Sequence, residues 1–405
     1  MKRIVFFSGD ITRGGGTERV GILIANALAD CKEYEVSVVS LTHGAPQPAF
    51  FLSPSIRREA LSDHWVTPGP GYLPLIFRLK KYIKQQKADL IIDIDGVLDI
   101  LSLPVKWMTG VRVISWEHFN YHYFDQVGSG YRNVIRRLAA RYADAIVVLT
   151  ERDRGFYLEH LKIRHEIRVI HNPADYLEPD QSGSIHMSEK KELLSVGGLV
   201  DAKGFVRVPR IARVLKERYP SLNFVWRIAG EGEQRAEIEG QIRECGVQDQ
   251  VKLLGRIADV SPLYDQADLY VMTSKREGLP MVLLEAKQYG LPIVSYDILT
   301  GPSEVIDDGV NGRLIPETGD EQKDAAAMAD AIGRLLTDEA LYDSFAQHAR
   351  DHIEDFLLEP IVEQWKELLE LVLSGKLDID TAAETCGITP EEFQEKLAKA
   401  KKQNR

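Results

Sequence analysis

Two successive series of short apolar, β-branched runs alternate with amphipathic stretches of helical period along this chain. The runs of the first series lie at residues 4–7, 36–41, 90–94, 111–115, 145–149 and 168–170. Those of the second series lie at residues 193–196, 224–229, 251–254, 269–272, 293–296 and 312–315. Apolar strands that alternate with helices are typical of parallel sheets covered on both faces. The sequence therefore predicts an α/β protein with two doubly wound domains.

A polar, glycine-containing stretch at residues 178–191 separates the two series and is interpreted as a linker. A chain of 405 residues is too long for one ordinary core. The predicted domains are residues 1–177 and 190–355. Residues 374–405 indicate two short capped helices around Gly387. We expect this tail to be a docking element, although it also faintly resembles a helix-turn-helix that reads DNA.

Composition narrows the class of protein. A hydrophobic fraction of 44% and a charged fraction of 27% are ordinary for a globular enzyme, and a net charge of −11 argues against general nucleic-acid binding. No run reaches the roughly 18 apolar residues of a transmembrane helix. The three scattered cysteines are typical of a reducing compartment. The expected location is cytoplasmic, with any membrane contact peripheral.

The segment Ser274-Lys-Arg-Glu-Gly-Leu-Pro-Met-Val-Leu-Leu-Glu-Ala286 carries the most chemical information. Pro280 is favoured as a first helical residue, so a helix is predicted to start there. The N–H groups of a helix N-terminus suit a phosphate or diphosphate. Glu277 and Glu285 flank this anion site, and carboxylates are good acceptors for pairs of sugar hydroxyls. The pattern predicts a site for a sugar nucleotide.

Other glycine-rich or polar motifs follow predicted strands in both series. They are Gly14-Gly15-Gly16-Thr17-Glu18-Arg19, Glu117-His118, Val196-Gly197-Gly198-Leu199 through Lys203-Gly204, Ala229-Gly230-Glu231-Gly232 and Thr300-Gly301-Pro302-Ser303-Glu304. Together with the Glu-x7-Glu pattern, they resemble retaining glycosyltransferases of the GT-B fold, closest to family 4 (GT4). The resemblance covers most of the chain. It implies two Rossmann-like domains facing a cleft, with a helix at about residues 357–373 crossing back to complete the first domain.

The resemblance also implies roles for individual residues. Glu277, His118 and Lys203 are the expected catalytic residues: Glu277 and His118 position the transferred sugar, and Lys203 offsets charge on the departing diphosphate. Glu285 is expected to hold the ribose. The remaining residues expected to bind the donor are Gly15, Gly16, Gly198, Gly230, Arg256, Ile257, Gly278, Leu279 and Pro280. Many relatives carry an arginine where this chain has Gly198, so one of two expected cations is missing; Arg276, Arg207, Arg19 or backbone amides are candidate replacements.

No metal and no cofactor are predicted. Asp93-Ile94-Asp95 suggests the Asp-x-Asp metal motif of another glycosyltransferase fold, but it closes a strand of the first domain, away from the donor motifs. Backbone groups around Arg256 and Ile257 are expected to read the nucleobase. Uridine is the expected base because the Thr300 to Glu304 motif resembles that of enzymes of bacterial surface-polysaccharide assembly, and guanosine is the alternative.

The predicted activity is retaining transfer of a hexose or N-acetylhexosamine from a UDP-sugar to a hydroxyl of a lipid-linked glycan. A basic amphipathic helix could bring the protein to an anionic membrane, or it could be an ordinary solvated helix face. Its cations are Arg132, Arg136, Arg137 and Arg141. Two other functions stay open: a soluble glucan or sucrose-type synthase, and a degenerate nucleotide-sugar-binding protein without turnover.

Overall fold

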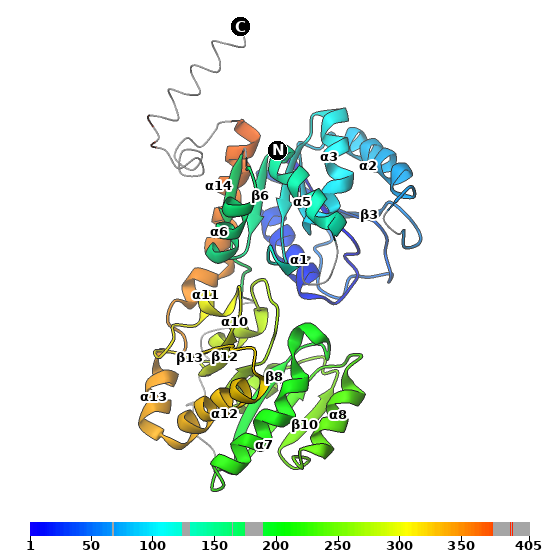
Figure 1. Ribbon diagram of the computed structural model, residues 1–405. Helices are drawn as coiled ribbons and strands as arrows, with labels where there is room; N and C mark the ends of the chain where they lie inside the picture. Colours follow the sequence, from blue (N-terminus) through cyan, green and yellow to red (C-terminus); the bar gives the residue numbers. More distant parts are fainter. Residues whose placement is uncertain are drawn as a thin grey trace. The chain divides into compact units, whose positions relative to one another are not determined.

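The computed structural model describes residues 1–66, 69–123, 130–163, 165–174 and 189–375, together with Thr389 and Glu391. Most of the predicted linker and nearly all of the predicted tail lie outside the described residues. The described chain divides into two compact units, which are shown in Figure 1. The first unit comprises Met1–Pro173 and helix α14 (Leu358–Ser374), and the second comprises Ala174–Leu357.

The first unit is built on a seven-stranded parallel sheet with the order β3-β2-β1-β4-β5-β6-β7. Its strands are β1 (Lys2–Ser8), β2 (Tyr34–Ser40), β3 (Arg57–Ala60), β4 (Leu90–Ile94), β5 (Arg112–Trp116), β6 (Ala145–Val148) and β7 (Glu166–Val169). The central strand β4 is buried along its whole length, as its sequence predicts, since Asp93 is its only polar residue. Because all the strands are parallel, their carboxyl ends meet at one edge, where ligands bind in open α/β sheets.

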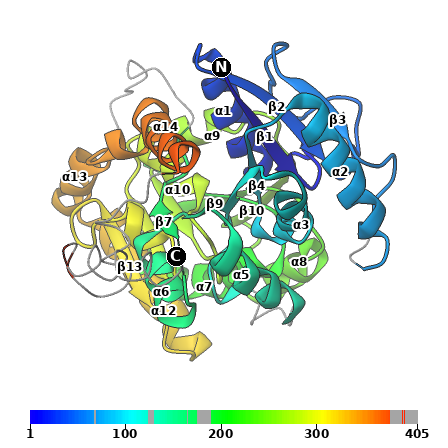
Figure 2. The ribbon, with the colours of Figure 1, turned by 90° about the horizontal axis from the view of Figure 1, so that it is seen from above.

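Helices cover both faces of this first sheet. They are α1 (Gly16–Asp30), α2 (Tyr72–Gln86), the 3-10 turn η1 (Gly96–Leu98), α3 (Asp99–Thr109), α5 (Gly130–Tyr142) and α6 (Glu151–His160). Helix α1 packs against α14, whereas α2 packs on α3 and α3 on α5. Right-handed crossovers require this division, because the chain passes from β1 to β2 in one direction and from β3 to β4, β5 and β6 in the other. Figure 2 shows α1 and the α2–α3 pair on different sides of β1.

The second unit is built on a six-stranded parallel sheet with the order β10-β9-β8-β11-β12-β13. Its strands are β8 (Lys191–Val196), β9 (Phe224–Ala229), β10 (Val251–Gly255), β11 (Leu269–Met272), β12 (Ile293–Asp297) and β13 (Gly312–Pro316). Its helices are α7 (Val208–Arg218), α8 (Arg235–Glu244), α9 (Ser261–Gln266), α10 (Met281–Gln288), α11 (Pro302–Val305), α12 (Glu321–Thr337) and α13 (Glu339–His348). Three 3-10 turns complete it: η2 (Asp201–Lys203), η3 (Phe205–Arg207) and η4 (Ile353–Phe356).

Every strand named from the sequence is present, with ends within a few residues of the predicted ones. Strand β3 was not predicted, because its sequence Arg-Arg-Glu-Ala carries no apolar alternation and it lies at the edge of the sheet. Within the described ranges, no helix is long and apolar enough to cross a bilayer. The two units are therefore both doubly wound α/β domains, as the alternating pattern predicts.

Candidate active site

The loop after β8 is shaped by glycines at the carboxyl edge of the second sheet. Gly204 has a φ of 64°, and a Cβ at this position would overlap the carbonyl oxygen of Thr273. Gly204 thus allows η2 to lie against the end of β11. Two backbone bonds fix the contact, from Lys275 N and Arg276 N to Ala202 O, at 2.8 and 3.3 Å. The loop that carries Lys203 is consequently held beside the segment that carries Glu277.

Lys203 and Glu277 form an ion pair at this edge. Lys203 Nζ lies 2.8 and 3.0 Å from the two carboxylate oxygens of Glu277, and Ser274 Oγ donates to Glu277 Oε1 at 2.6 Å. The side chains of Lys203 and Glu277 are 27% and 10% exposed. Thr300 Oγ1 donates to the backbone carbonyl of Glu277 at 2.7 Å, which anchors the turn from the side of the Thr300 to Glu304 motif. Three sequence motifs thus converge on one accessible carboxylate–ammonium pair.

A second charge cluster borders this pair. Asp201 Oδ1 lies 2.6 Å from Lys275 Nζ, and Asp201 Oδ2 lies 2.7 Å from the Arg276 guanidinium. Hydrogen bonds from Lys275 and Arg276 lower the pKa of the Asp201 carboxyl below its usual value. Arg276, one candidate for the missing cation, is therefore engaged by Asp201.

Arg207, another candidate, is also engaged within the second unit. It forms an ion pair with Glu317 at 2.7 Å and stacks over the ring of Tyr296. At Gly198 itself, a Cβ would meet Glu231 O at 3.7 Å and Val200 Cγ1 at 3.9 Å, which are ordinary van der Waals contacts. The position of the absent arginine is thus sterically open to a side chain.

Helix α10 starts one residue later than predicted. Pro280 has a ψ of 109°, so it is the N-cap and Met281 is the first helical residue. Gly301 packs against the ring of Pro280, where a side chain would overlap it, and this fixes the turn Gly278-Leu279-Pro280. The N-terminus of α10 nevertheless follows Glu277 at the carboxyl edge, as the motif predicts.

Glu285 lies on α10 and is hydrogen-bonded to an aromatic residue that the sequence did not indicate. Tyr264 Oη donates to Glu285 Oε2 at 2.7 Å. The ring of Tyr264 stacks between those of Tyr270 and Tyr289, with centroids 5.8 and 5.2 Å away. This aromatic stack fixes the direction in which the Glu285 carboxylate points.

The two remaining segments that the sequence predicts to bind the donor lie at neighbouring strand ends. Gly230 forms a bridge with Gly255, and its N–H donates to Gly255 O at 2.8 Å. A Cβ on Gly230 would overlap the carbonyl oxygen of Gly197, so the loops after β8 and β9 touch through glycine. Arg256 and Ile257 follow directly and are exposed.

In the first unit, the glycine loop opens helix α1. Gly15 is the N-cap, and a side chain there would overlap the carboxylate of Glu18. Glu18 is 7% exposed and lies 3.3 Å from Arg13. Burial raises the pKa of Glu18, against the lowering effect of Arg13 and of the backbone N–H groups of Gly15 and Glu18. Gly15 and Gly16 therefore lie at the start of α1, next to the buried carboxylate of Glu18.

His118 follows β5 and is 7% exposed. Its ring packs on Trp116 with centroids 4.5 Å apart, and Trp116 packs on Trp365 of α14 at 4.7 Å. Burial lowers the pKa of His118 to about 3, so the imidazole is neutral at physiological pH. His118 Nε2 is buried without a hydrogen-bond partner among the residues that the structure describes. A buried polar atom of this kind is satisfied by a ligand or water.

Glu117 forms a buried ion pair with Arg136, which corrects the prediction of a basic surface helix. Arg136 lies 3.3 Å from Glu117, and the two side chains are 2% and 3% exposed. Its guanidinium also lies over the rings of Tyr121 and Tyr157, 5.2 Å from each centroid. Arg136 thus faces the interior, while Arg137 and Arg141 on the same helix are exposed. The sequence contains a signal for this burial, because Arg136 lies on the same helical stripe as Ile135, Ala139 and Ala140, which are buried.

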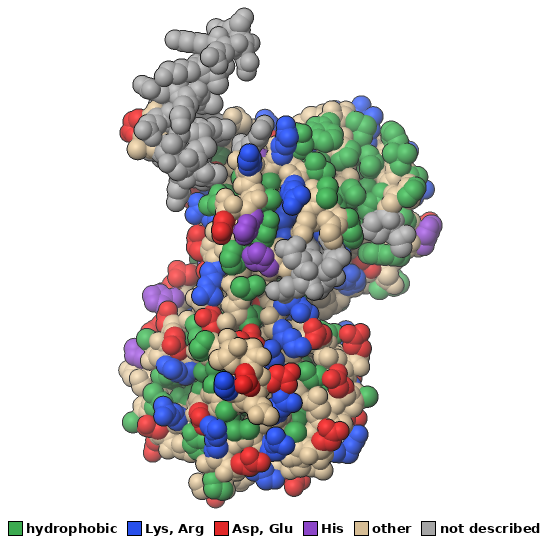
Figure 3. Space-filling view, in the orientation of Figure 1, with side chains coloured by type: hydrophobic (Ala, Val, Ile, Leu, Met, Phe, Trp, Pro, Cys, Tyr) green, Lys and Arg blue, Asp and Glu red, His purple; other side chains and the backbone are tan. Residues whose placement is uncertain are grey.

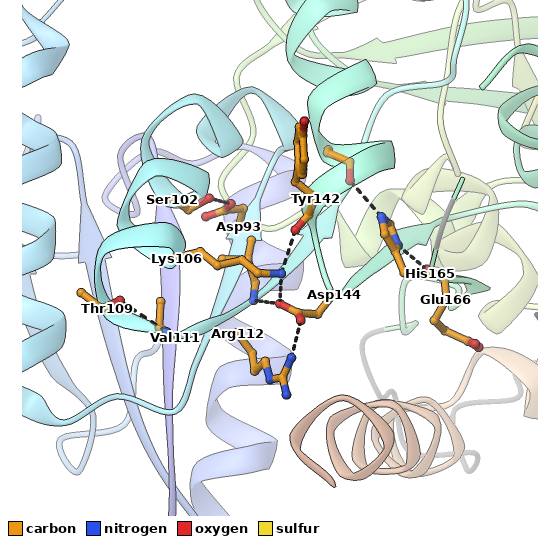
Figure 4. Close-up of polar contacts among 12 residues, drawn as sticks. Asp93, Ser102, Lys106, Thr109, Val111, Arg112, Tyr142, Asp144, His165 and Glu166 are labelled. Atoms are coloured by element: carbon orange, nitrogen blue, oxygen red, sulfur yellow. Dashed lines mark hydrogen bonds and ion pairs between the residues drawn. The ribbon is translucent and has the colours of Figure 1, made fainter. Parts of the chain in front are cut away.

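Asp93 of the Asp-x-Asp motif is fully buried and hydrogen-bonded within the first unit. Ser102 Oγ donates to Asp93 Oδ2 (Figure 4), and Ser115 Oγ donates to Asp99 Oδ2 at 2.6 Å. Burial raises the pKa of Asp93 to about 7, and burial together with the neighbouring Asp93 raises the pKa of Asp99 well above its usual value. Over the residues that the structure describes, no cluster of His, Cys, Asp and Glu could hold a metal ion.

Solved structures with the same architecture define the class of protein. The chain superposes with a TM-score of 0.79 on sucrose-phosphate synthase from Thermosynechococcus elongatus, at 19% identity and covering 93% of this chain and 100% of that one. It superposes with a TM-score of 0.71 on Anabaena HepE in complex with UDP and glucose, at 20% identity and covering 91% and 100%. The two parallel-sheet units have the GT-B fold.

Sequence relatives identify the family. Residues 14–176 match the model of Glycosyltransferase Family 4, and residues 179–352 match that of Glycosyl transferases group 1. The chain is 31% identical over 370 residues to an uncharacterized glycosyltransferase of Haemophilus influenzae, covering 91% of this chain and 100% of the relative. The chain therefore belongs to glycosyltransferase family 4.

Two further relatives have more specific descriptions. The amylovoran biosynthesis glycosyltransferase AmsD of Erwinia amylovora is 26% identical over 379 residues, covering 91% of this chain and 100% of the relative. A Campylobacter jejuni enzyme, described as GalNAc-alpha-(1->4)-GalNAc-alpha-(1->3)-diNAcBac-PP-undecaprenol alpha-1,4-N-acetyl-D-galactosaminyltransferase, is 28% identical over 375 residues, covering 91% and 98%.

Membership in this family defines the chemistry at the class level. Family 4 consists of retaining hexosyltransferases that use a nucleotide-sugar donor and need no metal ion. The protein is thus a nucleotide-sugar-dependent glycosyltransferase of glycan biosynthesis.

Proposed function

We propose that this protein transfers a hexose or N-acetylhexosamine, with retention, from a UDP-sugar to a hydroxyl of a lipid-linked glycan in bacterial cell-surface polysaccharide synthesis. The observation that carries the proposal is the accessible Lys203–Glu277 pair beside the N-terminus of α10. We assign its work to the cytoplasmic face of the membrane, where a lipid-linked acceptor is accessible to a peripheral enzyme.

Descriptions of other proteins support the substrate classes. The Campylobacter relative is described as acting on an undecaprenol-linked glycan, and the Erwinia relative as acting in amylovoran biosynthesis. HepE was solved with UDP and glucose. These descriptions support uridine as the base and a lipid-linked glycan as the acceptor in our proposal, and the exposed residues Arg256 and Ile257 are the proposed place for the base.

In this mechanism Lys203 contacts both Glu277, which binds the sugar, and the leaving diphosphate. An ammonium has three N–H donors, so Lys203 can hold the Glu277 carboxylate and still donate to a diphosphate oxygen. As the glycosidic bond breaks, negative charge grows on the diphosphate and positive character grows on the anomeric carbon. Lys203 and the α10 N-terminus stabilise the first of these charges. Glu277 accepts hydroxyl groups of the sugar and orients it.

Other residues have positioning roles. Glu285, whose direction is set by Tyr264, accepts the ribose hydroxyls. Neutral His118 offers Nε2 to the transferred sugar as a hydrogen-bonding group, and Gly15 and Gly16 allow the acceptor side to approach the phosphate. The acceptor attacks from the side of the leaving group, and its proton passes to the departing phosphate oxygen.

A nucleotide-sugar panel tests the proposal. The wild-type protein is incubated with UDP- and GDP-sugars, with and without a lipid-linked oligosaccharide, and released nucleotide is measured while NMR follows the anomeric configuration of the product. We expect slow release of UDP from one UDP-sugar, strong stimulation by the lipid-linked acceptor and a retained configuration. Stimulation by a free sugar instead would indicate a soluble synthase, and nucleotide binding without turnover would indicate a degenerate binding protein.

A further inference from the structure

Exposed apolar side chains gather on one face of the first unit. Leu73 and Phe77 of α2 are 59% and 55% exposed, Trp107 of α3 is 61% exposed, and Val134 and Leu138 of α5 are 53% and 38% exposed. Because α2 packs on α3 and α3 packs on α5, these side chains belong to one helical layer. Figure 3 shows hydrophobic side chains gathered over α2 and α3. We call the solvent-facing side of α2, α3 and α5 the outer face.

The outer face is also positively charged, although the protein is acidic. The chain has 61 acidic and 50 basic residues. In contrast, α2, α3 and α5 together contain one acidic residue, Asp99, and it is fully buried. The exposed basic residues of these helices are Arg78, Lys81, Lys84, Arg137 and Arg141. The outer face therefore combines large apolar side chains with cations and no exposed carboxylate.

The opposite side of the same sheet has a different character. Helix α14 carries Glu359, Glu363, Glu367 and Glu370 on its sequence, and its apolar residues Ile361, Trp365 and Leu368 are fully buried. No exposed large hydrophobic side chain is present among the described residues of α1 and α14. The combination of exposed aromatic residues and cations is thus a property of one helical layer and not of the whole unit.

The outer face is held rigidly on the sheet. Asp144, which precedes β6, accepts from Lys106 Nζ at 2.6 Å and from Arg112 at 2.9 Å, and Lys106 Nζ also donates to Tyr142 O at 2.7 Å (Figure 4). These bonds join the last turns of α3 and α5 to β5. Trp107 packs edge-on against Tyr142 with centroids 5.3 Å apart. A partner therefore meets a preformed surface and not one that must be ordered on binding.

We propose that the outer face docks onto the surface of an anionic lipid bilayer. Tryptophan and phenylalanine insert at the boundary between headgroups and acyl chains, and lysine and arginine are attracted by anionic headgroups. A second copy of this chain fits the surface less well, because a two-fold contact would bring Lys81, Arg137 and Arg141 against the same cations of the other copy. The docking site differs from the basic helix expected from the sequence, since Arg136 is buried and α2 and α3 add exposed apolar side chains to those of α5.

The position of the outer face within the first unit suits a lipid-linked acceptor, a consequence that rests on the proposed function. Helix α5 contacts η1, which follows β4 at the carboxyl edge of the sheet. His118 lies at the same edge, directly after β5. A glycan attached to a lipid in the bound bilayer would thus enter the first unit at the edge where the acceptor is expected.

Co-sedimentation of the full-length protein with lipid vesicles tests the docking surface. We expect the wild-type protein to sediment with vesicles of equal parts phosphatidylcholine and phosphatidylglycerol, and not with phosphatidylcholine alone. The double variants Phe77→Ser/Trp107→Ser and Lys81→Glu/Arg137→Glu should each weaken binding at least about tenfold. Matched controls are Phe51→Ser, an exposed aromatic residue outside these helices, and Lys32→Glu/Lys162→Glu, which should bind like wild type.

Circular dichroism and release of UDP from the UDP-sugar with a soluble acceptor should be unchanged in all variants. Equal binding to both vesicle types, or unchanged binding by both outer-face variants, would overturn the docking proposal. So would a wild-type dimer that the outer-face variants convert to monomer without loss of vesicle binding. Failure of the proposed function is distinguishable, because no UDP-sugar would then be turned over while vesicle binding persisted.

Discussion

Each unit of this protein has a carboxylate–cation pair whose carboxylate lies in the segment that follows a strand of its parallel sheet, and the two pairs differ in burial. In the second unit, Lys203 and Glu277 lie 2.8 Å apart and are 27% and 10% exposed. In the first unit, Arg136 and Glu117 lie 3.3 Å apart and are 2% and 3% exposed. The accessible pair can exchange its partners for ligand atoms, whereas the buried pair has aromatic rings around it. We therefore propose that the same chemistry serves ligand binding in the second unit and structure in the first.

Of the changes that test this comparison, removal of the buried cation Arg136 should have the largest effect on stability. Arg136→Met leaves Glu117 as an unpaired buried charge, which should lower the free energy of unfolding of the first unit by about 3 to 5 kcal/mol. Urea unfolding followed by hydrogen exchange in β4 and β5 measures this. Arg137→Met, an exposed neighbour on the same helix, should change the same quantity by less than about 0.5 kcal/mol. Equal losses in the two variants would contradict the structural role of Arg136.

Substitution in the Lys203–Glu277 pair should lower the activity much more than the stability. Glu277→Gln keeps the shape of the side chain but removes the charge that orients Lys203, and it should lower kcat by about 100- to 1000-fold. Because Lys203 is 27% exposed and keeps contact with water when its partner loses charge, the free energy of unfolding should change by only about 1 kcal/mol, less than in Arg136→Met. Steady-state release of UDP and urea unfolding test both statements. Glu285→Gln is the control: it should mainly raise the KM for the donor. A fully active Glu277→Gln enzyme would refute the assignment.

Burial should also make the stability of the first unit depend on pH. Asp153 accepts from the N–H of Tyr121 at 2.7 Å, and burial raises its pKa to about 7 despite nearby Arg136. A raised pKa means that the folded state binds the proton more tightly, so this stabilisation is complete below the unfolded pKa of about 4 and is lost as the pH rises through about 7.

Asp153→Asn should remove this pH dependence, because the amide oxygen still accepts from Tyr121 and carries no charge. Between about pH 5 and pH 8, the free energy of unfolding of the wild type should fall by about 2 kcal/mol more than that of the variant. Urea unfolding across this pH range measures the difference. Parallel curves for the two proteins would show that Asp153 titrates normally.

The smallest expected effect is a gain in affinity for UDP when an arginine is placed at the sterically open position Gly198. An arginine there meets only ordinary contacts at its Cβ and can donate to a diphosphate, so Gly198→Arg should tighten UDP binding by about tenfold. Gly230→Ala is the control for added bulk, because its Cβ would overlap Gly197 O and should destabilise the second unit. Calorimetric titration with UDP measures the gain. Unchanged affinity would show that the second unit does not direct residue 198 toward the diphosphate.

The sequence predicted those parts of the fold and site that depend on local pattern. Apolar runs located the strands, and Pro280 located the start of α10 to within one residue. Strand β3 escaped prediction because its residues are polar and its pairing is defined by β2 alone. Tyr264 and the burial of Arg136 also escaped, since both depend on packing between distant segments. Charged residues at helical spacing suggest a solvent-exposed helix face. Only the alignment of Arg136 with the apolar stripe of Ile135 and Ala139 indicates that its side chain is buried.

The central claim is that the Lys203–Glu277 pair binds the donor, with Lys203 donating to the diphosphate and Glu277 accepting from the sugar. Calorimetric titration of UDP into wild type, Lys203→Met and Arg137→Met tests it most directly. We predict that Lys203→Met lowers the affinity for UDP by about tenfold or more, with unchanged urea unfolding, and that Arg137→Met binds as wild type. Wild-type affinity in Lys203→Met would contradict the account.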